Sequence, residues 1–100
     1  MACEIPCIVT NYTTTYEILR EGGTCGLPVA ICADVTGSWT VERGIMDIND
    51  CVAQMETYYY SPELREKHGK VGRKKALEIY DWNIIGDSWD KLFQKEGIQI

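Results

Sequence analysis

The residues best suited to chemistry in this 100-residue chain are one histidine and five cysteines. His68 has no carboxylate or serine arranged near it in the sequence, so we assign no catalytic residue. The cysteines are odd in number and lack a Cys-x-x-Cys pair, which argues against a disulfide framework and a zinc site. We therefore expect no metal and reduced, mostly buried thiols at Cys3, Cys7, Cys25, Cys32 and Cys51.

Two further clusters allow a binding role or a structural one. The basic stretch from Arg65 to Lys75 could attract an anionic membrane or a polyanion, but a charged helix face is usually solvated. Residues 58–60, three tyrosines, could stack on sugar rings, but aromatic residues at a helix end usually pack against the core. We favour the structural role for both clusters. The net charge of -5 also disfavours nucleic-acid binding.

Hydroxyl groups gather at Thr13, Thr14 and Thr15, just before Tyr16. Residues 14–17 have the capping-box form, in which a threonine hydroxyl accepts from an unpaired backbone N–H and the glutamate reaches back. Capping alone accounts for these threonines, and phosphate binding at this helix start is the alternative. Glu21, one to two turns further on, is by residue type a solvated helix residue.

Apolar runs predict the strands that position these side chains. Residues 3–10 are short, apolar and β-branched toward their end, and residues 27–33 form the continuous apolar run of a strand buried on both faces. Residues 39–41 predict a brief third strand after a polar turn. The right-handed crossover rule makes the first two strands parallel neighbours.

Local signals predict two helices in the first 60 residues. The first begins at Thr14 and ends at residues 24–25, where Gly26 takes the left-handed conformation that follows a helix. The second begins at Asp47 or Asn49, either of which can cap it. Its apolar residues recur at the spacing of one helix face: Ile48, Cys51, Val52, Met55 and Tyr59.

Two more helices follow. Ser61 and Pro62 supply a capping hydroxyl and a proline at the first helical position, and this helix runs to Tyr80. Asp81 caps the last helix, at about residues 82–96. That helix carries an apolar stripe that needs a cover: Trp82, Ile85, Trp89, Leu92 and Phe93.

This order of elements predicts an α/β class. We expect a partial Rossmann-like domain over residues 1–100, with a short parallel sheet flanked by about four helices. A chain of this length holds a modest core. It has no transmembrane segment and no basic, then hydrophobic, leader, so we expect a cytoplasmic protein.

Three segments resemble the C-terminal domain of retaining glycosyltransferases with the two-Rossmann-domain (GT-B) fold, of the family 4 or glycosyl transferases group 1 type. The segments are residues 2–10 (ACEIPCIVT), residues 21–30 (EGGTCGLPVA), and residues 61–65 with 72–75 and 80–82. The second is the most specific, because it is similar to the family's Glu-Ala-x-x-x-Gly-x-Pro-Val-hydrophobic signature. The resemblance covers nearly the whole chain and implies half of a GT-B C-terminal domain.

The resemblance implies a donor site for a nucleotide-sugar, a UDP- or GDP-sugar. Glu21 would hold the ribose hydroxyls, and the backbone N–H groups near Thr13, Thr14, Thr15 and Tyr16 would face the diphosphate. No metal or other cofactor is implied, because this fold neutralises the diphosphate with protein groups. The chain departs from the family at Thr13, where the family has a second glutamate followed by a Gly-aromatic-Gly turn.

The resemblance begins partway through the family's C-terminal domain and includes no acceptor-binding domain. Half of a cleft cannot position donor against acceptor, so we expect a truncated hexosyltransferase-type fragment or subunit that is inactive alone. The alternative is a non-catalytic half-Rossmann module that acts through protein–protein interaction. In either case the apolar stripe of the last helix is expected to pack on a separate N-terminal domain subunit or to form a homo-oligomer.

Overall fold

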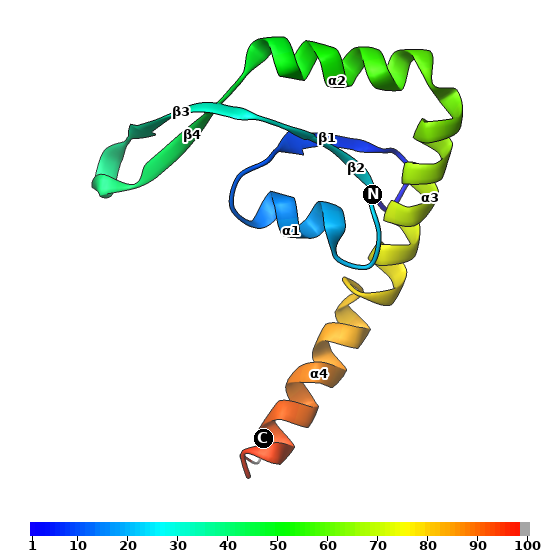
Figure 1. Cartoon of the computed structure of the whole chain (residues 1–100). Coiled ribbons are helices and arrows are strands. Elements are labelled where there is room, and N and C mark those ends of the chain that lie inside the picture. The colour runs from blue at the N-terminus through cyan, green and yellow to red at the C-terminus, as the bar shows by residue number, and fades with distance from the viewer. Residues whose placement is uncertain (99–100) are drawn as a thin grey trace.

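The computed structural model describes residues 1–98 and shows an α/β protein with two small sheets and four α-helices (Figure 1). Strands β1 (Cys7–Thr10) and β2 (Gly26–Val29) are parallel, and helix α1 (Thr14–Arg20) connects them. Strands β3 (Ile31–Thr36) and β4 (Glu42–Met46) form an antiparallel hairpin. Helices α2 (Ile48–Tyr60), α3 (Pro62–Glu78) and α4 (Trp82–Lys95) complete the chain.

The β1–α1–β2 unit confirms the expected parallel pair with a helical crossover. Helices α1 and α2 lie on opposite sides of the pair, and α3 runs past its end (Figure 1). The core at this junction is small, with Leu19, Cys25, Val29 and Tyr58 as its buried apolar side chains. The first strand is shorter than the predicted 3–10, because residues 1–6 form a turn and an extended lead-in instead of pairing.

The predicted strand over residues 27–33 is wrong in one respect, since it breaks at Ala30. The Ala30 N–H donates to the Asp50 carboxylate at 2.7 Å, and the Ala30 carbonyl accepts from the Asp47 N–H at 2.8 Å. Both backbone groups of Ala30 are therefore taken by the start of α2. The chain leaves the parallel pair at this point and enters the exposed hairpin.

The predicted strand at residues 39–41 is also wrong. Residues Ser38–Thr40 form a 3-10 turn in which Trp39 and Thr40 have φ values of 63° and 57°. A positive φ at two consecutive non-glycine residues is incompatible with a strand. The turn is the tip of the hairpin, and the second strand begins two residues later, at Glu42.

Helix α1 ends earlier than expected, at Arg20 instead of residues 24–25. Gly22 and Gly23 have φ values of 75° and 118°, so they and not Gly26 supply the left-handed turn that ends the helix. Gly26 belongs to β2, where a Cβ would lie 2.2 Å from the Cys7 carbonyl oxygen. Glycine is needed at position 26 for close approach of the two strands and not for a helix end.

The helix starts at Asp47, Pro62 and Asp81 agree with the prediction. Asp47 accepts from the N–H groups of residues 49 and 50, and Asp81 accepts from that of residue 83. Two predicted hydroxyl caps do not form, because neither Ser61 nor the threonine at the start of α1 makes a side-chain cap bond. Pro62 at the first helical position therefore favours the start of α3 without a capping hydroxyl.

Of the five apolar residues predicted to share the inner face of α2, only Cys51 is partly buried. Ile48, Val52, Met55 and Tyr59 are 71%, 49%, 58% and 74% exposed, and Tyr58 is instead the buried residue of this helix. The face that packs on the sheet contains Cys51, Gln54 and Tyr58. The chain is also extended, with a radius of gyration of 17.3 Å against about 13 Å for a compact domain of this length.

Candidate functional site

The threonine turn lies at the carboxyl end of β1, where open α/β sheets bind their ligands. Thr13 is the N-cap of α1 with φ 51° and ψ -137°, a strained backbone conformation for a non-glycine residue. The Thr13 and Thr14 side chains are exposed. The Thr15 hydroxyl is half-buried and lies 2.6 Å from the carbonyl oxygens of both Thr10 and Tyr12, so it serves the turn itself.

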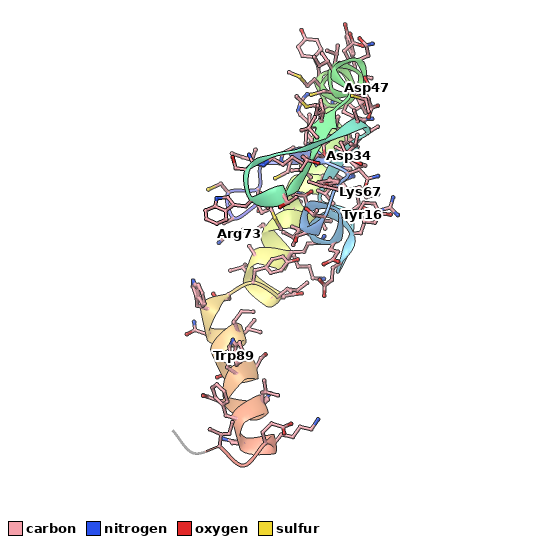
Figure 2. All side chains as sticks on the ribbon, turned by 90° about the vertical axis from the view of Figure 1, so that its left-hand side faces the viewer. Tyr16, Asp34, Asp47, Lys67, Arg73 and Trp89 are labelled. Carbon is pink, nitrogen blue, oxygen red and sulfur yellow. The ribbon has the colours of Figure 1, made fainter. Side chains whose placement is uncertain are left out.

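Tyr16 is held by its own helix. The guanidinium carbon of Arg20 lies 4.5 Å from the centre of the Tyr16 ring, a cation–π contact one turn along α1. Figure 2 labels Tyr16 on α1. One face of this ring is therefore already used within the chain, and its other surface is half-buried.

Glu21 lies at the opposite end of α1 from the threonine turn. It is the C-cap residue, its side chain is exposed, and its N–H donates to the Glu17 carbonyl at 2.8 Å. Seven helical residues separate it from Thr13, which corresponds to about 10 Å along the helix axis. Burial raises the pKa of Tyr80, and the negative charge of Glu21 raises it further.

The hollows near α1 do not join these residues. One hollow of about 110 Å³ is apolar and is lined by Met1, Cys7, Val9, Thr15, Ile18 and Leu19. A second of about 320 Å³ is lined by Leu19, Arg20, Thr24, Gly26, Leu27 and Pro28. Neither is lined by Thr13 or Glu21. The expected donor-site residues therefore lie along one helix, and neither of these two hollows joins its two ends.

A buried ammonium group ties α1 to α3, contrary to the expected solvation of the whole basic stretch. Lys75 is 1% exposed, and its Nζ donates to the carbonyls of Ile18 and Leu19 at 2.9 and 3.0 Å. It also lies 3.6 Å from the Cys25 Sγ. The two carbonyls belong to the last turn of α1, where no further helical N–H is available to them.

The signal for this contact was present in the spacing of α3. His68, Gly72 and Lys75 follow one another at four and three residues, and all three are buried. The thiols were predicted less well, because Cys25 alone is buried while Cys3 and Cys32 are exposed. All five cysteines are free.

Tyr58 and His68 form a second buried polar pair. The Tyr58 hydroxyl lies 2.7 Å from His68 Nδ1, and the two rings meet edge to face. Burial raises the pKa of Tyr58 to about 12, with further contributions from Cys7 and Cys25. Burial also lowers the pKa of His68, as does the charge of Lys67. Both side chains are uncharged at neutral pH and closed to solvent, which suits a structural role.

The residues of α4 that were expected to bind a partner form an exposed apolar stripe. Trp82, Trp89 and Leu92 are 85%, 54% and 44% exposed, and no residue of α4 is buried. The rings of Trp89 and Phe93 stack at 5.5 Å, and Ile85 is half-buried. Figure 2 shows this helix extending away from the rest of the protein, with Trp89 on its side.

Residues 1–98 were also searched for metal-binding groups and for membrane-spanning helices. They contain no group of three His, Cys, Asp or Glu side chains that could hold a metal ion. None of their helices combines the length and the apolar character needed to cross a membrane. Comparison with models of protein families, with curated proteins and with solved structures gives no match to the chain.

Proposed function

We propose that this chain is a fragment or subunit of a GT-B-type glycosyltransferase that contributes part of a nucleotide-sugar donor site. The observation that carries this proposal is the parallel β1–α1–β2 unit, with the exposed, strained threonine turn at the carboxyl end of β1. In this proposal the unit is a partial Rossmann-like half-domain. The five free thiols fit a reducing compartment such as the cytoplasm.

The positions of Glu21 and the threonine turn suit the two ends of a nucleoside diphosphate. The ribose would bind at Glu21 and the diphosphate at residues 13–16, at the other end of α1. The ligand would lie along the exposed side of the helix instead of in an enclosed pocket. Such a surface holds a donor weakly and does not position an acceptor, so the chain is inactive without a second half of the cleft.

Calorimetric titration of the full chain with UDP, GDP and their sugar conjugates tests this proposal. We expect weak, saturable binding of one nucleotide that is lost in Glu21→Ala and kept in Glu56→Ala. Glu56 is a matched control because it is an exposed glutamate of α2, on the other side of the sheet. Absence of binding to the folded chain, or equal loss in both variants, would overturn the donor-site proposal.

A second candidate is a non-catalytic module that acts through protein–protein interaction. The observation that favours it is the exposed apolar stripe of α4, in which no residue is buried. Isolated exposed apolar residues are ordinary, but an aligned stripe of this kind marks a contact surface. Retention of self-association or partner binding in the Glu21→Ala variant, without any nucleotide binding by the wild type, would favour this candidate.

A further inference from the structure

The spacing of the α4 stripe fits the pairing of two helices. Trp82, Ile85, Trp89 and Leu92 follow one another at three, four and three residues, the repeat of a two-helix seam. These positions place all four side chains along one side of the helix. The stripe has no covering element within residues 1–98, since no residue of α4 is buried.

The charges beside the stripe differ between the two ends of α4. Asp81, Ser88 and Lys95 are seven residues apart and therefore share one flank of the seam. The acidic residue stands at the N-terminal end of this flank and the basic residue at the C-terminal end. An antiparallel second copy of α4 brings each Asp81 opposite a Lys95, whereas in a parallel pair this flank faces the other flank of the partner helix and these ion pairs do not form.

We propose that α4 binds a second copy of this chain, with the two α4 helices antiparallel. In this arrangement Trp82 packs on Leu92 of the second copy, and Ile85 packs on its Trp89. Two symmetric ion pairs between Asp81 and Lys95 close the flank. The helix dipoles also oppose one another, which favours the antiparallel orientation.

The other exposed apolar helix face lacks this complementarity. The outer face of α2 contains Ile48, Val52, Met55 and Tyr59, but the charged residues of α2 are Asp50 and Glu56, with Asp47 as its cap. Two such faces repel each other in either orientation. The charge pattern therefore favours α4, and not α2, as the helix that binds the second copy.

Sedimentation equilibrium of the full chain over a concentration series tests the pairing. We expect a concentration-dependent dimer that becomes monomeric in Trp89→Glu and in Leu92→Lys. The two residues are exposed and lie on the projecting helix, so the folded body should remain intact, as checked by near-ultraviolet circular dichroism. A wild-type chain that stays monomeric, or a dimer that persists in both folded variants, overturns the proposal.

Charge reversal tests the antiparallel orientation. Lys95→Asp should weaken the dimer about tenfold, because it replaces two attractions by two repulsions. In an Asp81→Asn background, which keeps a capping side chain, the same reversal should have little effect. Lys91→Asp is the matched control, since its side chain lies away from the seam. Equal weakening by Lys91→Asp and Lys95→Asp overturns the orientation.

The pairing does not depend on the proposed donor site. Nucleotide titration of the monomeric Trp89→Glu variant separates the two, because Trp89 lies on α4 and Glu21 on α1. Loss of nucleotide binding with retention of the dimer, or the reverse, identifies which of the two proposals has failed.

Discussion

Helices α3 and α4 follow one another in the chain but relate to the rest of the protein in opposite ways. Helix α3 is rich in charged residues, and yet it buries His68, Gly69, Gly72 and Lys75. Helix α4 has the stronger apolar stripe and buries nothing. Burial in this protein therefore follows close backbone approach and hydrogen bonding at α3, and apolar content alone does not predict it.

The test of this contrast with the largest expected effect replaces one glycine by alanine on each helix. A Cβ on Gly69 would lie 2.1 Å from the Glu4 carbonyl oxygen, whereas a Cβ on Gly86 would have no neighbour within 4 Å. We expect Gly69→Ala to lower the free energy of unfolding by about 3 kcal/mol through overpacking. Gly86→Ala should raise helix stability by about 1 kcal/mol. Urea unfolding measures both, and similar effects in the two variants would contradict the contrast.

A second test removes the buried ammonium group. Lys75→Met keeps much of the side-chain volume but removes the Nζ donor from the Ile18 and Leu19 carbonyls, of which the Leu19 carbonyl still accepts from the Cys25 N–H. We expect a loss of about 2 kcal/mol of unfolding free energy. The neighbouring Lys74 is exposed, so Lys74→Met should change stability by less than about 0.5 kcal/mol. If the two variants unfold at the same urea concentration, the Lys75 contacts contribute nothing to stability.

The smallest expected effect at neutral pH comes from the Tyr58–His68 pair. Tyr58→Phe removes one buried hydrogen bond, and we expect it to lower the unfolding free energy by about 1 kcal/mol. Its pH dependence is more specific. The pKa of Tyr58 is about 12 in the folded protein and 10.0 for the free side chain. The contribution of neutral Tyr58 to the free energy of unfolding is therefore fully present below pH 10 and is lost as pH rises through 12.

His68 gives the opposite dependence. The pKa of His68 in the folded protein is below 6.5. The contribution of neutral His68 to the free energy of unfolding is therefore fully present above pH 6.5 and is lost as pH falls through the pKa of the folded state. Unfolding free energies measured from pH 4 to 11 should show a shallower alkaline decline in Tyr58→Phe and a shallower acid decline in His68→Gln than in the wild type. Unchanged slopes in both variants would mean that the pair is not buried in solution.

Features that depend on short stretches of sequence were predictable. Asp47, Pro62 and Asp81 start helices because a cap or a proline acts on the next few residues, and the β1–α1–β2 unit follows from the apolar runs and the crossover rule. The break at Ala30 was not predictable, because the Asp50 carboxylate that holds it lies 20 residues further on. The spacing of α3 places Lys75 on the same side as His68 and Gly72, but the carbonyls that it binds were not predictable because they lie 56 and 57 residues away.

The position of the candidate site in the fold was predictable, but the length of the helix that joins its two ends was not. Residues 13–16 were expected at the carboxyl end of the first strand, and they lie there. The early end of α1 was not expected, because either Gly22 and Gly23 or the later Gly26 could have supplied the left-handed turn. The role of Glu21 and the threonine turn in donor binding stays a prediction.

The contacts of α3 with the first residues of the chain also affect the order of folding. Arg73 donates to the Ala2 carbonyl at 2.7 Å, Gly69 accommodates Glu4, and Lys75 holds the end of α1. During synthesis, the N-terminal third therefore emerges well before the segment that completes its hydrogen bonding. The β1–α1–β2 unit therefore gains its contacts with α3 only after residue 75 has left the ribosome.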